Sequence, residues 1–231
     1  MKILHLYHDL MNLYGDYANV SALSKILKAN SIDAQVDKKS IYDGVSLSDY
    51  DFIFIGAGTE ENQKIALAHL KNMKNDVAEC VLSGKFFLAT GNAAEMFGEK
   101  ITTPSGEFEG LGVFTYTTVQ QNEQRIAEDG IFLFEDKEIV GFVNKCGWMT
   151  GVDTPLFKVE KGFGNEENGK TEGVWKNNFF GTQLTGPILV KNPHFLKHIA
   201  SLMTGKEVSD EEFGYEKAGF EITLNKLRGR K

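Results

Sequence analysis

Short apolar runs alternate with segments of helical periodicity through the first hundred residues, and this alternation restricts the fold more than any other feature. Residues 51–55 contain a continuous apolar run, which is typical of a strand buried on both faces. Further strands are expected at residues 2–7, 34–36 and 85–89, and helices at residues 16–28, 60–73, 77–82 and 94–97. Strands and helices that alternate in this way are joined by right-handed crossovers. We therefore expect a parallel sheet with helices on both of its faces.

Residues 108–180 have a different sequence pattern, in which short strand-like pieces lie between turns rich in Gly and Asn. These pieces favour an antiparallel extension of the same domain. The expected fold is an α/β fold with three layers, of the flavodoxin-like kind, whose mostly parallel sheet carries this extension. A length of 231 residues suits one large domain or two small ones. We assign one domain to residues 1–205, and a C-terminal helix with a basic tail to residues 206–231.

Charge and cysteine content exclude several classes of protein. The net charge is −7, and densely basic sequence is confined to residues 226–231, so no nucleic-acid partner is expected. No stretch approaches the roughly 20 apolar residues that a membrane span requires. Two cysteines, Cys80 and Cys146, are too few for a disulfide framework in a chain of this length. His8 and Asp9 interrupt any apolar signal-peptide core, and we expect a cytoplasmic protein.

Two loops at the expected carboxyl edge of the sheet are the first places to search for chemistry, because open parallel sheets bind ligands there. One consists of Gly56, Ala57 and Gly58, whose small side chains let backbone N–H groups approach an oxyanion. A simple turn is the alternative. The other, residues 88–93, runs from a strand through a tight turn into a helix, which is the context of a nucleophile elbow. An elbow needs Ser or Cys at its tip, and this chain has Gly91.

Seven blocks of sequence carry a family resemblance. They are residues 5–7 (His-Leu-Tyr), 10–16 (Leu-Met-Asn-Leu-Tyr-Gly-Asp), 56–58 (Gly-Ala-Gly), 110–113 (Gly-Leu-Gly-Val), 162–165 (Gly-Phe-Gly-Asn), 172–174 (Glu-Gly-Val) and 181–189 (Gly-Thr-Gln-Leu-Thr-Gly-Pro-Ile-Leu). In order and spacing these blocks resemble the class I glutamine amidotransferase-like family of the cobyric acid synthase type. The resemblance extends over about residues 3–203. Within the family, the chain resembles in particular the glutaminase subunit of bacterial lipid II isoglutaminyl synthase.

The resemblance implies a glutaminase reaction in which an elbow cysteine attacks the side-chain amide of glutamine and releases ammonia. It also implies a Mur-ligase-like protein partner in the amidation of cell-wall peptidoglycan. Family members have Cys where this chain has Gly91, and His where it has Thr185. No intact catalytic pair is therefore expected. Because nucleophile and base act as a unit, hydrolysis should fall by several orders of magnitude.

Part of the family's binding apparatus is retained. Arg125 aligns with an arginine that relatives place at the glutamine site, and its planar fork suits the carboxylate of glutamine or of another ligand. An arginine on a solvated turn is the alternative. The resemblance also assigns Gly56, Ala57 and Gly58 to the oxyanion side of the site. Thr59 and Glu95 both stand where relatives have Gln.

Other side chains that might supply a nucleophile or a metal site have ordinary interpretations. Thr90 precedes the tip of the elbow, and strand alternation points it to the other face of the sheet. Cys146 is interpreted as an incidental thiol on a loop, and Cys80 as a core residue. The five histidines show no metal-ligand spacing, and none lies in residues 183–187. We expect neither a metal site nor a cofactor.

Three hypotheses of function remain open. In the first, the chain is a catalytically inactive amidotransferase homologue that acts as a binding or regulatory subunit. In the second, it is a working glutamine-hydrolysing subunit of lipid II or cobyric-acid-type amidation that uses an unrecognised nucleophile. In the third, it is a small-molecule sensor with a cleft between Gly56 and Gly91. The third hypothesis requires that this cleft be open and not filled by Phe, Met and Trp148 side chains.

Overall fold

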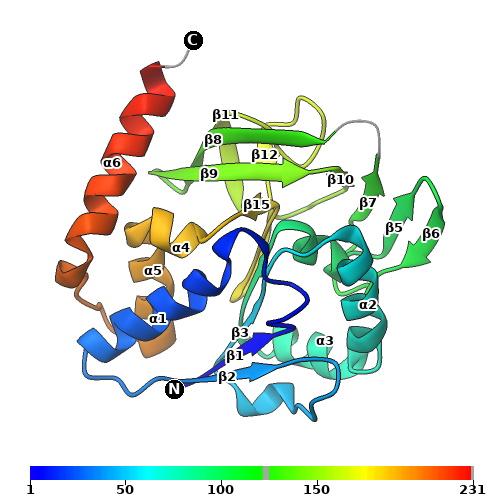
Figure 1. Cartoon of the computed structure of the whole chain (residues 1–231), viewed down its shortest axis with the longest axis horizontal. Coiled ribbons are helices and arrows are strands. Elements are labelled where there is room, and N and C mark those ends of the chain that lie inside the picture. Colours follow the sequence, from blue (N-terminus) through cyan, green and yellow to red (C-terminus); the bar gives the residue numbers. More distant parts are fainter. Residues whose placement is uncertain (122–124, 230–231) are drawn as a thin grey trace.

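The computed structural model describes residues 1–121 and 125–229 (Figure 1). Within these residues the central sheet has the strand order β13-β14-β4-β3-β1-β2. All neighbours pair in parallel except β13, which is antiparallel to β14. The strands are β1 (Lys2–Leu6), β2 (Gln35–Lys39), β3 (Phe52–Ile55), β4 (Phe86–Thr90), β13 (Val174–Lys176) and β14 (Phe179–Thr182). The predicted mostly parallel sheet is confirmed.

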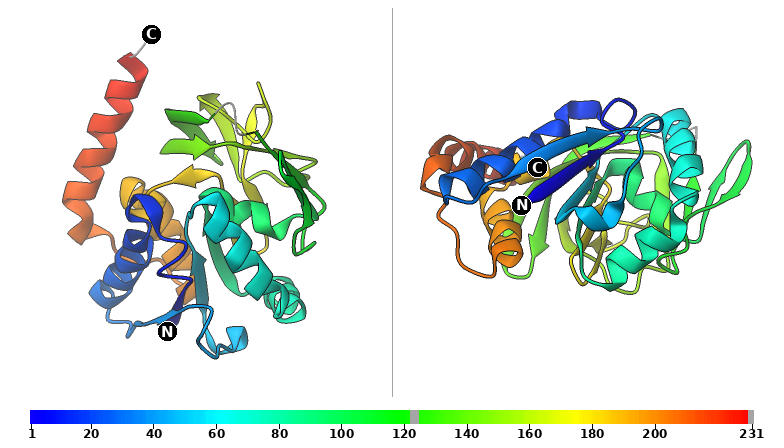
Figure 2. Two further views of the ribbon diagram at one scale, coloured as in Figure 1. Left: turned by 45° about the vertical axis from the view of Figure 1, so that its right-hand side comes forward. Right: turned by 90° about the horizontal axis from the view of Figure 1, so that it is seen from below.

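Helices cover both faces of this sheet and give the molecule its three layers, as the two further views in Figure 2 show. One face carries α1 (Tyr17–Ala29), α4 (Ile188–Lys191) and α5 (Pro193–Thr204), and the other carries α2 (Glu60–Lys71) and α3 (Lys74–Leu82). Successive side chains of β3 alternate between these faces. Phe52 and Phe54 belong to the apolar core under α1 and α5, whereas Ile53 and Ile55 belong to the core under α2 and α3. The apolar run at residues 51–55 is therefore buried on both sides, as predicted.

Two smaller sheets extend the domain beyond the carboxyl ends of the central strands. The first has the order β10-β7-β5-β6, with β5 (Lys100–Thr103), β6 (Gly106–Glu109), β7 (Thr117–Gln120) and β10 (Gly147–Thr150). The second has the order β12-β11-β8-β9-β15, with β8 (Ile126–Phe134), β9 (Lys137–Lys145), β11 (Phe157–Lys161), β12 (Thr171–Glu172) and β15 (Leu184–Thr185). The expected antiparallel extension is present, but β5 pairs with β7 in parallel.

The C-terminal helix α6 (Gly214–Gly229) stands along the edge of the molecule, after the short helix η4 (Glu211–Phe213) (Figure 1). Its Leu224 and Leu227 form a small apolar cluster with Ile131 and Val140. The last two residues of the predicted basic tail, 230–231, lie outside the described residues. None of the helices in the described part of the chain is long and apolar enough to span a bilayer.

Candidate active site

The tip of the predicted elbow is a turn between a strand and a helix. Strand β4 ends at Thr90, and the short 3-10 helix η3 (Gly91–Phe97) follows directly. Gly91 has φ +58°, in the left-handed region that favours glycine. The predicted placement of Gly91 at a strand-to-helix turn is confirmed.

Thr185 lies next to Gly91, as predicted from their positions in the family pattern. A Cβ built on Gly91 would lie 3.1 Å from Thr185 Cγ2. Thr185 is buried in β15, and its hydroxyl donates a hydrogen bond to the carbonyl oxygen of Phe142, 3.2 Å away. The two positions at which the resemblance implies a nucleophile and a base therefore meet in this chain, as glycine and threonine.

Ala57 fills the space beside Gly91. A Cβ on Gly91 would lie only 2.6 Å from the Ala57 Cβ, which is far inside van der Waals contact. Ala57 is buried, and its methyl group has no rotamer by which to move away. The structure thus accommodates glycine at the tip and no larger residue without a backbone shift.

Two backbone donors of the loop at Gly56, Ala57 and Gly58 are already engaged within the protein. The Ala57 N–H donates to Asp16 Oδ2 at 2.7 Å, and the Gly58 N–H donates to Asn92 Oδ1 at 3.0 Å. Asn92 Nδ2 donates in return to the Gly58 carbonyl oxygen, also at 3.0 Å. An oxyanion hole needs N–H groups that point freely at the reacting oxygen. In this conformation Ala57 and Gly58 do not present such groups.

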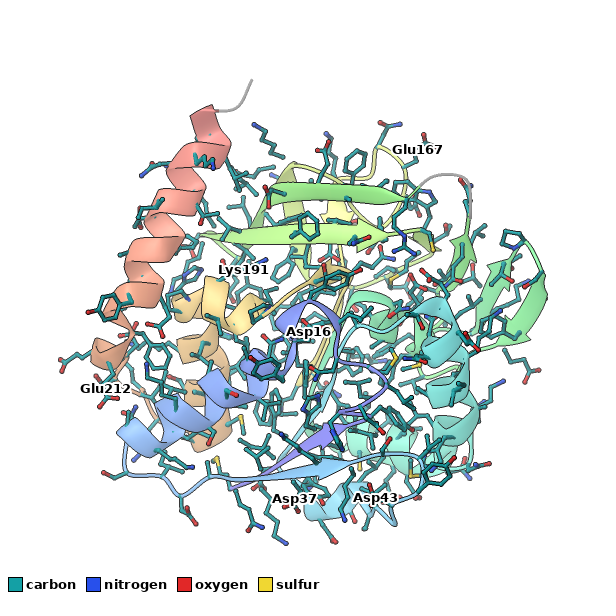
Figure 3. All side chains as sticks on the ribbon, viewed as in Figure 1. Asp16, Asp37, Asp43, Glu167, Lys191 and Glu212 are labelled. Carbon is teal, nitrogen blue, oxygen red and sulfur yellow. The ribbon has the colours of Figure 1, made fainter. Side chains whose placement is uncertain are left out.

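Asp16, the last residue of the Leu-Tyr-Gly-Asp block, is buried and is labelled in Figure 3. Its hydrogen bonds hold the elbow and this loop together. Its Oδ2 also accepts a hydrogen bond from Thr90 Oγ1 at 2.8 Å. Burial raises the pKa of Asp16 to about 6, although the Ala57 N–H, the Thr90 hydroxyl and Lys191 oppose the shift. Nothing in the chain order indicates that residues 16 and 90 meet, so this hydrogen bond could not be predicted from the sequence.

Arg125 lies at the mouth of the site, but it is occupied by protein groups. Its Nη2 pairs with Glu60 Oε1, and its Nη1 donates to Asn144 Oδ1 at 3.1 Å. Glu60 is the first residue of α2, and Thr59 caps this helix by accepting a hydrogen bond from the Asn62 N–H. The preceding residues 122–124 lie outside the described residues. Carboxylate binding by Arg125 stays a prediction.

Little free volume remains between these side chains. The cavity bounded by the loop, Asn92, the Arg125–Glu60 pair and Thr185 measures about 10 Å³. That is no more than the space one water molecule needs. The cleft at this loop is thus closed by Ala57, Asn92 and the ion pair, and the Met11 side chain packs against Gly58 of the same loop. Neither a Phe side chain nor Trp148 is among the described residues that line this cavity.

Residues 2–193 match the CobB/CobQ-like glutamine amidotransferase domain family. The chain belongs to this family. It is 32% identical over 193 residues to the lipid II isoglutaminyl synthase (glutamine-hydrolyzing) subunit GatD of Staphylococcus aureus, covering 83% of this chain and 79% of that protein. It is 30% identical over 216 residues to the GatD subunit of Streptococcus pneumoniae, covering 91% and 83%. Cobyrinate a,c-diamide synthase of Archaeoglobus fulgidus is 27% identical, covering 71% of this chain and 36% of that protein.

Solved structures support the family fold. The PurLQS structure from Thermotoga maritima contains a chain with TM-score 0.55 and 14% identity, covering 98% of both chains. A glutamine amidotransferase from the same organism has TM-score 0.56 and 11% identity, covering 99% of this chain and 95% of that one. At such low identity these likenesses establish the fold alone.

The thiol of Cys146 lies at the closed site of this amidotransferase-family chain. Cys146 Sγ donates a hydrogen bond to Glu60 Oε1 at 3.3 Å. Burial, followed by the negative charge of Glu60, raises the pKa of Cys146 to about 12. Because the thiolate is the reactive form of cysteine, this thiol is a poor nucleophile at neutral pH.

Behind the elbow lies a buried polar cluster that the sequence analysis did not find. Glu95 accepts hydrogen bonds from the Nε2 atoms of Gln63 at 3.0 Å, Gln120 at 2.7 Å and Gln183 at 3.1 Å. Burial raises the pKa of Glu95, and the three amide donors oppose this shift. Lys145 Nζ, which donates to Gln183 Oε1 at 2.7 Å, links Glu95 to the rest of the cluster. A fully hydrogen-bonded network of this kind makes the interior rigid.

Proposed function

We propose that this chain is a catalytically inactive member of the CobB/CobQ-like glutamine amidotransferase family that acts as a binding or regulatory subunit. The observation that carries the proposal is the contact at the elbow, where the Ala57 methyl group occupies the space of a nucleophile's Cβ at Gly91. A glutaminase nucleophile must leave the backbone at this point and reach the amide carbon of glutamine. Glycine offers no atom for that bond.

The loss of the base supports the same proposal. Thr185 offers a neutral hydroxyl that donates to Phe142 O, and a hydroxyl takes up no proton near neutral pH. The occupied N–H groups of Ala57 and Gly58 remove a third part of the machinery. Nucleophile, base and oxyanion donors act as a unit, and in such units the loss of one member costs nearly as much as the loss of all.

A working glutaminase, the alternative function, would need another nucleophile. Cys146 is the only cysteine among the described residues that line the site, and its raised pKa keeps it protonated. Thr90 Oγ1 is buried and donates to Asp16. Neither side chain has the exposed, activated geometry that attack on an amide requires.

The partner in this proposal is a Mur-ligase-like protein. The two GatD relatives are named as subunits of lipid II isoglutaminyl synthase, and the chain covers 79% and 83% of their lengths. A subunit that has lost hydrolysis can retain the surface that binds its partner, because interface and elbow are different parts of the fold. We place this role in the amidation of cell-wall peptidoglycan, in the cytoplasm.

Ligand binding at Arg125 is a second part of the proposal. A guanidinium recognises a carboxylate without any catalytic pair, so glutamine or another carboxylate ligand remains a suitable occupant beside Gly56, Ala57 and Gly58. In the structure Glu60 takes this place. A ligand must therefore displace Glu60 before it binds.

The deciding experiment measures ammonia release from glutamine by the purified chain, alone and with a Mur-ligase-like partner. The Staphylococcus aureus GatD relative, assayed with its own partner, serves as the positive control. We expect no release above background in either condition. Ammonia release that a Cys146→Ser variant abolishes would refute the proposal and identify Cys146 as the nucleophile. Release that survives Cys146→Ser would refute it equally.

A further inference from the structure

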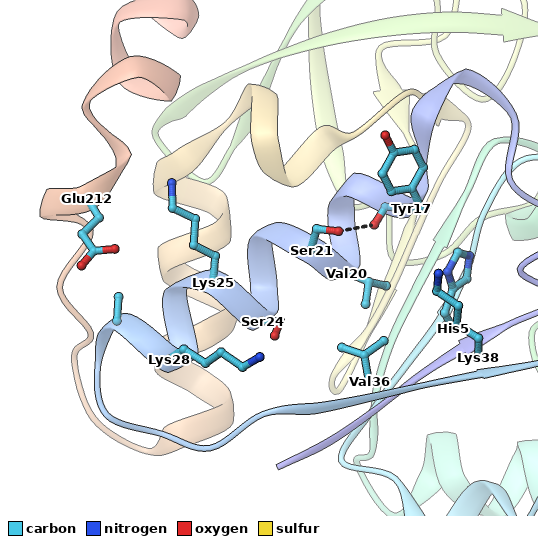
Figure 4. Close-up of a pocket in the computed structure, with 11 residues that line it drawn as sticks. His5, Tyr17, Val20, Ser21, Ser24, Lys25, Lys28, Val36, Lys38 and Glu212 are labelled. Atoms are coloured by element: carbon cyan, nitrogen blue, oxygen red, sulfur yellow. Dashed lines mark hydrogen bonds between the residues drawn. The ribbon is translucent and has the colours of Figure 1, made fainter.

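A separate groove lies between helix α1 and the edge of the central sheet, on the face that α1 covers (Figure 4). Its volume is about 730 Å³, within the range of sites that hold small ligands. Strand β2 is the edge strand here, and Val36 and Lys38 of β2 form one wall with His5 of β1. None of the elbow residues lines this groove.

Lysine side chains surround the groove, although the chain as a whole is acidic. Lys28 comes from α1 and Lys38 from β2, and Figure 4 shows both at the groove. Neither has an acidic partner in the part of the chain that the structure describes. Lys25 is different, since its Nζ lies 3.4 Å from Glu216 Oε1 and 4.5 Å from the centre of the Phe213 ring. Within the described residues, Lys28 and Lys38 therefore supply ammonium groups without acidic partners from the α1 and β2 walls of the groove, and Glu212 also lies on its lining.

His5 supplies a second, independent observation. It pairs in register with Lys38, so both side chains lie on the face of the sheet that α1 covers. His5 is only 1% exposed, and its Nε2 has no hydrogen-bond partner within the described residues. Burial, with His8 and Lys38 adding to it, lowers the pKa of His5 to about 4, so the ring is neutral at pH 7. Buried polar atoms are rarely left without a partner, and this one lies at the lining of a lysine-rich groove.

The remaining lining is suited to the uncharged part of a ligand. Val20 of α1 and Val36 of β2 provide apolar surface, and the hydroxyls of Ser21 and Ser24 lie on the same side of α1. Ser21 Oγ donates to the Tyr17 carbonyl oxygen at 3.3 Å, as drawn in Figure 4. Cationic groups beside a patch of apolar surface match a molecule that has an anionic end and an organic body.

We propose that this groove binds a small organic phosphate, with Lys28 and Lys38 supplying positive charge for its phosphate, its body against Val20 and Val36, and a polar atom at His5 Nε2. A phosphate suits these lysines better than a single carboxylate, because an ammonium group binds phosphate oxygens as a compact point charge and a phosphate carries more negative charge. The site is independent of the elbow and gives a binding subunit a place for a small-molecule signal.

Calorimetry with ADP, pyrophosphate and adenosine as probes, in buffer with EDTA, tests this site on the full chain. We expect ADP and pyrophosphate to bind, ADP more tightly, and adenosine to bind far more weakly. Lys28→Ala and Lys38→Ala should each weaken ADP binding roughly tenfold, which is the usual effect of losing one charged hydrogen bond. Lys39→Ala is the matched control, because Lys39 is the next residue on β2 and points to the opposite face.

Several results would overturn the proposal. They are no binding of either phosphate probe at millimolar concentration, equal losses in Lys39→Ala and Lys38→Ala, or ADP binding that Lys28→Ala leaves unchanged. The ring signals of His5 in an NMR spectrum give a readout that does not depend on the lysines. They should shift when ADP is added, and bound ADP that leaves them unmoved would contradict this location. None of the three variants and three probes enters the ammonia assay, so failure here is distinct from failure of the proposed function.

Discussion

At the scale of single residues, Gly91 and Ala57 constrain each other. The positive φ of Gly91 favours glycine, and the Ala57 methyl group leaves no room for a side chain. Asn92 and Asp16 then hold the loop at Ala57 and Gly58 by hydrogen bonds to its N–H groups. The Ala57 methyl group, which excludes a side chain at Gly91, is therefore itself held in place by the loop's hydrogen bonds.

Gly91→Ala is expected to lower the free energy of unfolding by about 1–3 kcal/mol, because it adds both backbone strain and a clash with Ala57. Urea unfolding measures this change. Gly205→Ala is the matched control, since Gly205 has φ +66° with nothing within 4 Å of an added Cβ. Adding Ala57→Gly should restore part of the stability lost in Gly91→Ala. Equal losses at positions 91 and 205 would show that the clash contributes nothing.

The double variant Gly91→Cys with Thr185→His is expected to release no ammonia at the rate of an active relative. The new Cβ would lie 2.6 Å from Ala57, and a displacement of about 1 Å costs about 10²-fold in rate. The nearby carboxyl of Glu95 would also disfavour a thiolate. Activity should rise only when Ala57→Gly and Asn92→Gly are added, which frees space and a backbone donor. Substantial ammonia release by the double variant alone would contradict this reasoning.

Asp16 gives the elbow a pH-dependent contribution to stability. Its pKa is about 6 in the folded chain and 3.8 when unperturbed, so the folded state binds this proton more tightly. The resulting stability is fully present below about pH 4 and is lost as pH rises to about 6, by up to ~1.4 kcal/mol per pH unit. Asp16→Asn removes this dependence. Urea unfolding of both proteins from pH 4 to pH 8 should give a difference that falls up to pH 6 and is level above it; a constant difference would argue against an ionising Asp16.

At the scale of elements, the first turn of α2 places the Glu60 carboxylate against Arg125 at the mouth of the site. Thr59 begins the helix with a capping hydrogen bond, and the next residue, Glu60, reaches Arg125 just before β8. The capping hydrogen bond stabilises the start of the helix, and with it the backbone position of Glu60. The position of α2 therefore decides whether Arg125 is available to a ligand.

Glu60→Gln is expected to strengthen the binding of glutamate severalfold, because Arg125 loses its internal ionic partner. Arg125→Ala should abolish the binding. Calorimetry with glutamate and glutamine measures both effects. Glu61→Gln is the matched control, since Glu61 lies in the same first turn and forms no ion pair in the described residues. If no heat is detected with wild type or with Glu60→Gln, Arg125 is not a carboxylate site.

At the scale of the whole molecule, the C-terminal segment is divided between core and surface. Val208 and Phe213 are each 1% exposed and belong to the core that also contains α1 and α5. Helix α6 contributes the small apolar cluster around Leu224 and Leu227, and surface ion pairs of Glu216 with Lys25 and of Arg228 with Glu138. The segment from residue 206 onward therefore has two parts. Residues 206–213 contribute to the core of the domain, and helix α6 lies at its periphery.

Cutting the chain after residue 213 is expected to leave the domain folded, whereas cutting after residue 205 should lower the free energy of unfolding by about 3–6 kcal/mol more. This is the usual contribution of burying one Val and one Phe side chain. Urea unfolding of the two shortened chains measures the difference. Equal stability would show that Val208 and Phe213 contribute nothing and that the domain ends at residue 205.

The sequence by itself determined the central fold and the identity of the residues at the elbow. Strands at residues 2–7, 51–55 and 85–89 could be predicted because burial on both faces demands continuous apolar runs, which remain visible in chain order. The hairpin of β5 and β6 was not assigned, because its strands are short and mostly polar and take their order from pairing with distant strands. The sequence alone also shows that position 91 is Gly and not Cys, and that position 185 is Thr and not His.

Only the tertiary structure decided the state of the site. The groups that close it join residues far apart in the chain, 34 positions for Asn92 and Gly58, 41 for Asp16 and Ala57, and 65 for Arg125 and Glu60. No local periodicity records such contacts, because they form only when separate loops meet at the carboxyl edge of the sheet. The same holds for the groove at His5, where α1 and β2 place Lys28 and Lys38 on one lining. Chain order sets which side chains exist, and packing sets which of them face one another.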